Sequence, residues 1–280
     1  MNNNRNVWTA TLGRLIAANR YTVYMIMNDI DYNNFRNQVL KQIVRNKKFI
    51  KSTNSIFHEC AWDNLYIASQ TLFKCIKTVD NKATEKENIL LQKLTNCLSD
   101  ILNALLSTTG GFLRGPGVLL RSIIESIACT IVIKMDNNKY DQYINNKLSP
   151  SSQITPSKKY FPEIGQIYGM LTNTFVHERY ETISRCIVEL EDNIEFSLLP
   201  NIEDIDFYQV YLLLISMLSR FVGAFSEYCF QHKFHQLYYW TRTDRKTVKE
   251  NKKTKEALKI LRLLDEMPDK YKPEQYRTAN

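Results

Sequence analysis

Apolar residues recur every three or four positions along most of the chain, which is the spacing of one face of an α-helix. This pattern predicts helices over residues 5–28, 31–52, 52–79, 84–109, 114–136, 161–181, 204–240 and 244–267. Thr84 and Glu87 have the spacing of a capping box at the start of the helix predicted at 84–109. Gly110 and Gly111 predict the end of that same helix. Between residues 186 and 199 the pattern alternates about Asp192–Asn193, which predicts a small β-hairpin. The sequence thus predicts an all-α bundle of about seven to eight helices with one hairpin.

The segment between residues 137 and 160 lacks this helical spacing. It contains Pro150, Pro156 and many Ser and Lys residues, so we expect a flexible loop, suited to a lid or a recognition element.

The helical pattern and the distribution of charge also divide the chain into three parts. Residues 1–83 are expected to be basic N-terminal helices that pack on the core, residues 84–240 the helical core, and residues 241–280 a basic helix and tail.

Composition narrows the class of protein. Of the 280 residues, 44% are hydrophobic and 24% are charged, as in ordinary globular proteins, and Gly (8) and Pro (7) are scarce, which favours long helices. No uncharged run reaches the ~18 residues of a membrane span, and no signal peptide is recognisable. The six cysteines show no C-x-x-C spacing and are expected to be reduced core thiols. We therefore expect a cytoplasmic protein that does not contact a membrane.

Common cofactor and metal motifs are missing from the sequence. There is no Walker loop, no G-x-G-x-x-G and no G-x-S-x-G. Cys229, His232 and His235 are three residues apart, so they would drift around a helix and could not share one metal ion without strain. We expect no cofactor and no metal site.

Positive charge is concentrated at the two ends of the chain. Residues 1–51 hold nine Lys/Arg and two Asp/Glu, residues 233–280 hold thirteen and seven, and the middle is net acidic. Such ends could form a phosphate-binding surface, or they could be solvated helix faces. The candidate nucleic-acid contacts are Arg45, Lys47, Lys48, Lys246, Lys249, Lys252, Lys253 and Lys255. Tyr238, Tyr239 and Trp240 lie near the last group and suit stacking on RNA bases or, equally, a protein contact.

An arginine and a glutamate interrupt the most apolar helix, "LLRSIIESIACTIVI" at residues 119–133. Arg121 and Glu125 are neighbours at i and i+4, and their apolar surroundings predict that both are partly desolvated and must be paired. One interpretation is a structural ion pair. The other is a site in which Arg121 holds an anion and Glu125 orients a partner.

His177 is the candidate third member of that site. On the helix predicted at 161–181, Tyr168 belongs to the apolar stripe. A separate, more polar stripe consists of Gln166, Met170, Asn173 and His177. If the polar stripe faces Arg121 and Glu125, the three groups could cleave a phosphodiester without metal, with His177 as general acid or base and Arg121 stabilising negative charge. The alternative is a helix cap or a surface histidine.

Three features resemble a known family. Gly-x-x-Leu-Leu-Arg-Ser-x-x-Glu at 117–125, Val176–His177 and the Pro/Ser-rich loop between them are similar to an "LLRSxxE…VH" family of uncharacterised bacterial helical proteins. That family resembles HEPN domains of toxin–antitoxin and phage-defence systems, and the resemblance covers residues 84–240. It implies a helical dimer and, where active, metal-independent RNA cleavage by an Arg and a His four to six residues apart. Here no arginine precedes a histidine at that distance, so Arg121 and His177 would act from two helices.

Two functions remain open at this point. The first is a cytosolic helical protein of a microbial antiviral-defence or toxin-type system that engages nucleic acid, with RNA favoured over DNA. It would either bind the nucleic acid alone or act as a metal-independent ribonuclease. The second is a non-enzymatic module that assembles with and regulates a catalytic partner encoded nearby, such as a reverse transcriptase or an ATPase. Both fit a homo-oligomer, and the sequence leaves open whether the protein is an enzyme.

Overall fold

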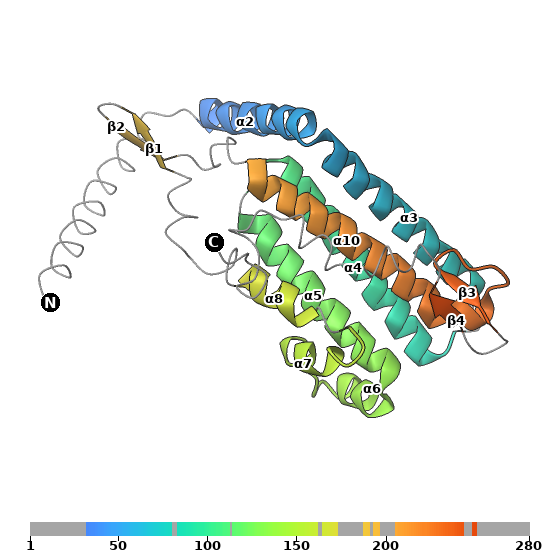
Figure 1. The fold of residues 1–280 in the computed structure, drawn as a ribbon. Helices are drawn as coiled ribbons and strands as arrows, with labels where there is room; N and C mark the ends of the chain where they lie inside the picture. Colours follow the sequence, from blue (N-terminus) through green and yellow to red (C-terminus); the bar gives the residue numbers. More distant parts are fainter. Residues whose placement is uncertain are drawn as a thin grey trace, which may run out of the picture. The chain divides into compact units, whose positions relative to one another are not determined.

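A computed structural model of the protein describes residues 32–79, 83–112, 114–161, 164–172, 187–190, 193–196, 205–243 and 248–250. Eight α-helices and two short antiparallel strand pairs lie within these residues, so the fold is all-α, as predicted (Figure 1). The chain divides into two compact units, residues 1–45 and 46–280. The helix bundle described below belongs to the second unit.

Four long helices form the core of the bundle. They are α3 (Ser55–Val79), α4 (Glu85–Thr109), α5 (Arg114–Met135) and α10 (Ile205–Phe230). α10 packs against α3 and α4, and α4 packs against α5, so that segments far apart in the sequence lie side by side (Figure 1). Each helix buries the apolar face that its sequence predicts, including Leu72, Leu94, Ile124 and Leu214. α3 belongs to the segment 1–83 that was predicted to pack on the core, and it forms one wall of this bundle.

Small residues bring α3 and α10 close together. A Cβ atom on Gly223 would lie 3.2 Å from the Cα atom of Ala68, and 3.0 Å from the hydroxyl of Tyr239. The absence of a side chain at Gly223 therefore permits the close approach of the two backbones. This crossing sets the distance between α3 and α10.

The ends of α4 are those that the sequence predicts. The Thr84 hydroxyl accepts a hydrogen bond from the Glu87 amide, and the Glu87 carboxylate accepts one from the Thr84 amide, which is a capping box. Gly110 forms the C-cap, and Gly111 has a φ of 84°, a conformation that favours glycine. The Tyr208 hydroxyl donates a hydrogen bond to the Gly111 carbonyl (3.0 Å), which joins this turn to α10.

The segment 137–160, predicted to be a flexible loop, is largely ordered, so that prediction is wrong. It contains α6 (Asn137–Ile144), a 3-10 helix η2 (Ser151–Gln153) and α7 (Ile154–Ser157), and α8 (Ile164–Leu171) follows. Asp136 caps α6, and Tyr140 and Tyr143 pack against the core. These elements lie along α5 because a few apolar anchors suffice to hold short helices whose sequence is otherwise polar.

The helix predicted at 204–240 ends ten residues early, at Phe230. The buried carboxylate of Glu227 accepts hydrogen bonds from the backbone amides of Tyr238 and Tyr239, both at 2.6 Å, so the chain folds back over the end of α10. A 3-10 helix η4 (Gln231–Lys233) makes the turn, and β3 (Trp240–Arg242) then pairs with β4 (Val248–Glu250). Residues 248–250, within the helix predicted at 244–267, therefore form a strand.

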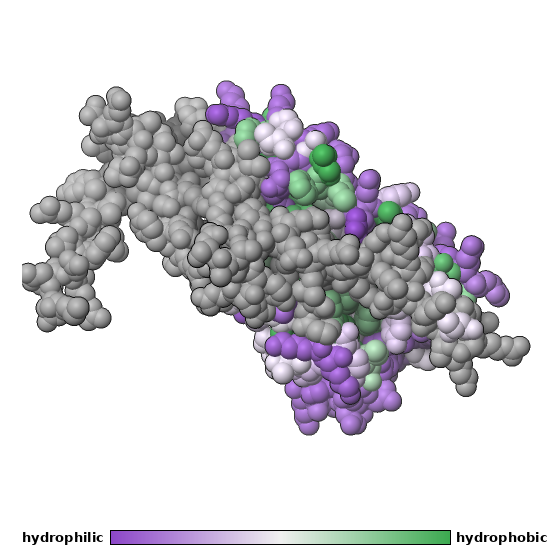
Figure 2. Space-filling model, in the orientation of Figure 1, coloured by the Kyte–Doolittle hydropathy of each residue, from purple (hydrophilic) through white to green (hydrophobic). Residues whose placement is uncertain are grey.

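Three further elements complete the described chain. β1 (Ile187–Leu190) and β2 (Asn193–Phe196) pair antiparallel, which confirms the predicted hairpin. α2 (Tyr32–Thr53) matches the helix predicted at 31–52, and Asn46 and Ile50 near its C-terminus are buried. The surface over α2 and α3 is mostly hydrophilic with apolar side chains interspersed (Figure 2).

Candidate functional site

Arg121 and Glu125 lie one turn apart on α5 and form an ion pair. The distance from Arg121 Nε to Glu125 Oε1 is 3.3 Å, and the two side chains are 32% and 22% exposed. Their neighbours Leu120, Ile123 and Ile124 are fully buried, so the pair lies at the border between core and solvent. The predicted pairing is confirmed, and both groups are partly desolvated as expected.

Tyr168 on α8 completes the pair. Its hydroxyl accepts hydrogen bonds from Arg121 Nε (3.3 Å) and Nη2 (2.9 Å) and donates one to Glu125 Oε1 (2.9 Å). The guanidinium carbon also lies 5.2 Å from the centre of the tyrosine ring. The three side chains thus form a closed network that joins α5 to α8.

The electrostatics of the network favour a permanently charged arginine. The hydrogen bond with Tyr168 raises the pKa of Arg121 above its usual value, against the effect of burial, and the Glu125 carboxylate raises it further. A guanidinium that already faces a carboxylate and a phenol has most of its charge compensated. As a chemical arrangement, the network is better suited to holding two helices together than to stabilising charge on a reacting phosphate.

His177, the third predicted site residue, lies outside the described residues, so its position relative to Arg121 and Glu125 stays a prediction. Part of the polar stripe on which His177 was predicted lies within the described residues. Its member Met170 is 4% exposed and belongs to the core. The residue that meets the pair is Tyr168, which the sequence pattern assigned to the apolar stripe. The signal for its role was the phenol itself, because a tyrosine hydroxyl near the core usually finds a polar partner.

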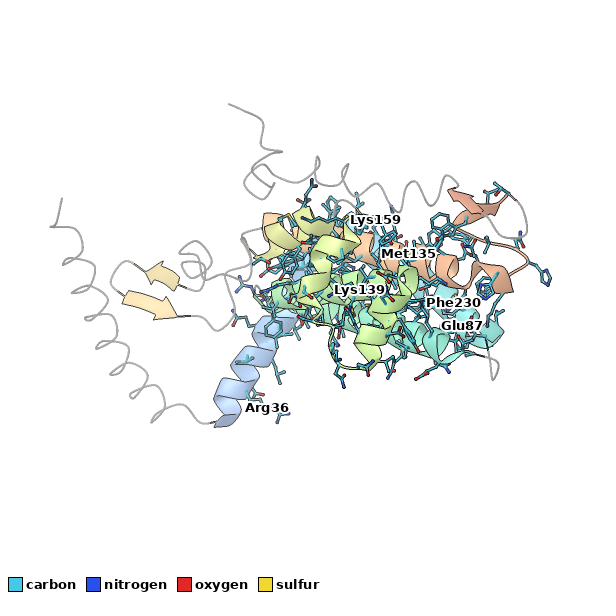
Figure 3. All side chains as sticks on the ribbon, turned by 90° about the horizontal axis from the view of Figure 1, so that it is seen from below. Arg36, Glu87, Met135, Lys139, Lys159 and Phe230 are labelled. Atoms are coloured by element: carbon cyan, nitrogen blue, oxygen red, sulfur yellow. The ribbon has the colours of Figure 1, made fainter. Side chains whose placement is uncertain are left out.

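The predicted basic contacts near the N-terminus lie on the exposed side of α2. Arg45, Lys47 and Lys48 are all exposed, and the helix carries three more exposed cations at Arg36, Lys41 and Lys51. No Asp or Glu occurs between Tyr32 and Thr53. At 100° per residue, the six cations fall on one half of the helix circumference. Figure 3 shows Arg36 extending from α2.

The predicted basic contacts near the C-terminus are mostly beyond the part of the chain that the structure describes. Lys249 lies in β4, whereas Lys246, Lys252, Lys253 and Lys255 fall outside the described residues. Of the nearby aromatics, Tyr239 is buried, and the Trp240 indole donates a hydrogen bond to the Ala224 carbonyl (2.9 Å). These two rings stabilise the return of the chain over α10, so only the exposed Tyr238 retains the predicted stacking role.

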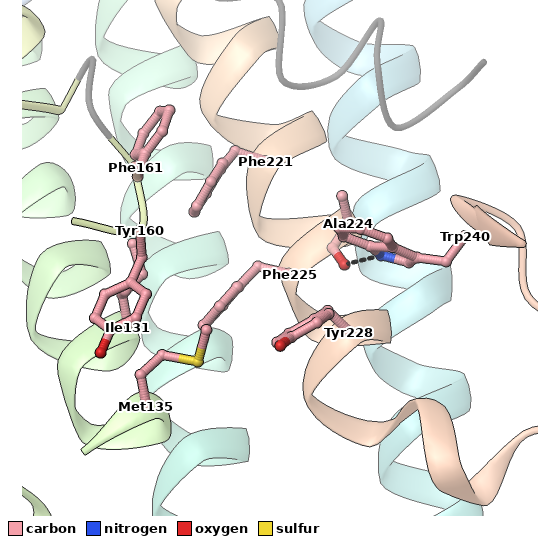
Figure 4. Close-up of a pocket in the computed structure, with 9 residues that line it drawn as sticks. All are labelled: Ile131, Met135, Tyr160, Phe161, Phe221, Ala224, Phe225, Tyr228 and Trp240. Atoms are coloured by element: carbon pink, nitrogen blue, oxygen red, sulfur yellow. Dashed lines mark hydrogen bonds between the residues drawn. The ribbon is translucent and has the colours of Figure 1, made fainter. Parts of the chain in front are cut away.

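An aromatic groove beside α10 is a second feature, which the sequence analysis did not single out. Phe161, Phe221, Phe225, Tyr228 and Trp240 form a continuous row, with successive ring centres 4.6, 5.8, 6.1 and 5.3 Å apart (Figure 4). The row lines a groove of about 230 Å³, and none of the described residues that border it is charged. The spacing of residues 221, 225 and 228 along one helix face was the available signal. Apolar walls without an acid, a base or a cation suit packing contacts better than catalysis.

A third feature is a polar cluster between α3 and α10. Arg220 Nε donates to Asn64 Oδ1 (2.8 Å), and Asn64 Nδ2 donates to Ser216 Oγ (2.6 Å). Cys60 Sγ lies 3.8 Å from Arg220 Nη2. These hydrogen bonds satisfy polar groups along a largely buried seam, and they specify how the two helices pair.

Thiols and metal ligands show no catalytic arrangement in the described part of the chain. Cys60, Cys75, Cys97, Cys129 and Cys229 are free, and burial raises the pKa of each of the last four. Such thiols are poor nucleophiles because the thiolate is disfavoured. The described part of the chain also contains no group of three or more His, Cys, Asp or Glu side chains that could hold a metal ion.

Two helices are long and apolar enough, by length and composition alone, to cross a membrane: Gly115–Met135 and Tyr208–Lys233. Most of each is buried inside the bundle, as in the core helices of soluble proteins, so this property is weak evidence for a membrane location.

Comparison with models of protein families, with curated proteins and with solved structures finds no match. The resemblance to HEPN domains therefore stays a prediction.

Proposed function

We propose that this protein is a helical nucleic-acid-binding protein that holds RNA or DNA through the outer face of α2 and does not cut it. The observation that carries the proposal is the charge of that face, which has six exposed Lys/Arg side chains and no carboxylate along the whole helix. A role in a microbial defence or toxin-type system rests on the HEPN resemblance and is part of the same proposal.

The charge of α2 suits a polyphosphate because nothing on the helix neutralises it. Surface lysines of most proteins are interspersed with Asp and Glu, which keeps the local potential low. Here each cation can replace a condensed counterion on a nucleic acid, and release of counterions drives binding. The exposed side chains of Leu40 and Val44, on the same half of α2, offer apolar contacts to the sugars and bases of a single strand.

The state of Arg121 supports binding without cleavage. The group expected to stabilise the transition state is bonded to Tyr168 and paired with Glu125. Two of the three guanidinium nitrogens, Nε and Nη2, are engaged by these partners. A phosphate would therefore compete with the Glu125 carboxylate for the charge of Arg121. The network therefore supports a structural role for this pair, which was one of the two interpretations of the sequence.

The test is a binding titration with fluorescently labelled single-stranded RNA, and DNA of the same sequence, in EDTA at about 50–300 mM KCl. We expect log K to fall linearly with log salt concentration. In Lys47→Glu/Lys48→Glu, affinity should fall at least about tenfold at the lowest salt, and the slope should fall by about 0.7 for each phosphate that the protein no longer neutralises. The matched control is Lys147→Glu/Lys159→Glu, which reverses two exposed lysines outside α2 and should bind like wild type.

The same mixtures, run on a denaturing gel, test cleavage. Intact RNA is the expected result. Fragments that disappear in His177→Ala and in Arg121→Ala would overturn the non-catalytic assignment and support the ribonuclease. Equal loss of affinity in the two lysine double variants, or no binding by wild type, would overturn the assignment of α2 as the binding face.

A further inference from the structure

One exposed face of α3 has the pattern of a helix that pairs with another helix. Its apolar side chains are Trp62 (36% exposed), Tyr66 (65%), Phe73 (51%) and Ile76 (41%). With Ser69 they occupy positions spaced by four, three, four and three residues, which is the seam of a coiled coil. Apolar side chains are visible among the polar ones along the course of α3 in Figure 2.

This stripe is distinct from the face that α3 uses inside the bundle. The buried residues of α3, such as Ala61, Ala68 and Cys75, recur with the same spacing but lie roughly 110° away around the helix. One apolar stripe therefore packs on the bundle, while the second faces solvent in a single copy of the chain. Large exposed aromatics arranged in a line mark a contact surface more often than isolated ones do.

The charges beside the stripe indicate which partner fits it. Three exposed residues lie on the flank next to the stripe and are seven residues apart: Asp63, Gln70 and Lys77. In an antiparallel helix pair, equivalent flanks face each other. A second copy rotated by half a turn about an axis near Gln70 places Asp63 opposite its Lys77, Gln70 opposite its Gln70, and Lys77 opposite its Asp63.

The apolar side chains match under the same rotation. Trp62 and Tyr66, on the N-terminal half of the stripe, come opposite Ile76 and Phe73 of the second copy. The small side chain of Ser69 lies near the axis, where two helices approach most closely. We propose that two copies of this chain associate through the exposed stripe of α3 in an antiparallel, two-fold symmetric helix pair.

Association through this face is independent of nucleic-acid binding, so it is tested on protein treated with nuclease. We expect sedimentation equilibrium and light scattering to show a concentration-dependent monomer–dimer equilibrium. Tyr66→Glu/Phe73→Glu should be monomeric with an unchanged circular dichroism spectrum, because both side chains are already exposed. Ile56→Glu is the matched control. It changes an apolar side chain of the same helix that is 80% exposed and lies off the stripe. A two-fold axis near Gln70 would place Ile56 beyond the end of α3 in the second copy, so this variant should dimerise like wild type.

Charge reversal tests the orientation of the pair. Asp63→Lys and Lys77→Asp should each weaken dimerisation about tenfold, since each places like charges opposite one another at two symmetric positions. Combining them in Asp63→Lys/Lys77→Asp should restore it. A parallel pair would place each residue opposite itself, so like charges would face each other in wild type and in every variant. Single reversals that leave dimerisation unchanged would therefore overturn the antiparallel arrangement.

A cross-link tests the axis. Gln70→Cys should give a covalent dimer with a short bismaleimide at dilute concentration, whereas the exposed Gln92→Cys on α4 should not cross-link above the wild-type background. A wild-type chain that is monomeric at all concentrations would overturn the proposal and assign the stripe to a different protein. A dimer that persists in Tyr66→Glu/Phe73→Glu would overturn the assignment to α3.

Discussion

Three residues decide how the candidate site is interpreted. Arg121 and Glu125 were recognisable as a pair because two opposite charges one turn apart cannot be left alone in an apolar helix. Tyr168 was not recognisable, because its position in the helical pattern is that of an apolar residue. Its hydroxyl bonds to both charges and closes the network, which changes the interpretation from an anion site toward a structural link between α5 and α8.

Replacing Tyr168 by Phe tests this link. The ring would remain, but the hydroxyl that bonds to Arg121 and Glu125 would be removed, and the ion pair would be left without its third partner. We expect the free energy of unfolding to fall by about 1–2 kcal/mol, as for hydrogen bonds to charged groups at a partly exposed site. Urea denaturation measures the change. Tyr160→Phe, which alters an exposed tyrosine, serves as the control, and equal stability of the two variants would contradict the structural role.

At the scale of elements, the predictable features were those carried by local sequence. The start of α4 at Thr84 and Glu87, its end at Gly110–Gly111 and the hairpin at 187–196 depend on residues close together in the chain. The wrong boundaries depend on distant contacts. Helix α10 stops at Phe230 because Glu227 binds the amides of Tyr238 and Tyr239, and no local signal distinguishes this return from a longer helix.

The capping box of α4 should make stability depend on pH. Burial acts to raise the pKa of the Glu87 carboxyl, but hydrogen bonds from Thr84 and Lys233 outweigh it, so the pKa is lower in the folded protein. A carboxyl of this kind stabilises the fold at neutral pH, and its contribution disappears as pH falls below the unfolded value of about 4.5.

Glutamine can still accept the hydrogen bond from the Thr84 amide, so Glu87→Gln removes mainly the charge that faces Lys233 at 3.0 Å. We expect the free energy of unfolding to fall by about 1 kcal/mol at neutral pH, and by progressively less as the pH falls below about 4.5. Denaturant titrations at a series of pH values would measure this. Glu85→Gln removes a charge from the same first turn at a residue outside the capping box and outside the ion pair with Lys233, so its effect should be smaller. A penalty for Glu87→Gln that does not vary with pH would argue against the assigned hydrogen bonds.

For the whole molecule, the question is what the two most apolar helices face. In the bundle, α5 directs Ile124 into the core with no exposed surface, whereas Val118 on the same helix is 46% exposed. This difference in exposure is typical of a helix that packs in a protein core and has one edge in contact with solvent. A helix surrounded by lipid would instead disfavour a charged side chain at both positions.

Two substitutions on α5 distinguish these cases. Ile124→Asp should cost more than about 4 kcal/mol and prevent soluble expression, because it buries an unpaired carboxylate. Val118→Asp should change stability by less than about 1 kcal/mol, because water already reaches the position. Yields from detergent-free extracts and thermal melts provide the comparison. Comparable damage by both substitutions would contradict the bundle as the environment of α5.

The sequence by itself determined the all-α class, the helix spacing, the capping box, the hairpin and the clustering of cations on residues 36–51. Each of these depends on periodicity or on neighbours within a few residues. Only the tertiary structure decided that Tyr168 joins the Arg121–Glu125 pair, that residues 137–160 carry helices, and that the second apolar stripe of α3 faces solvent. The physical reason is that hydrogen-bond partners and burial are set by segments distant in the chain, and one-dimensional periodicity records which side chains share a face but not what that face meets.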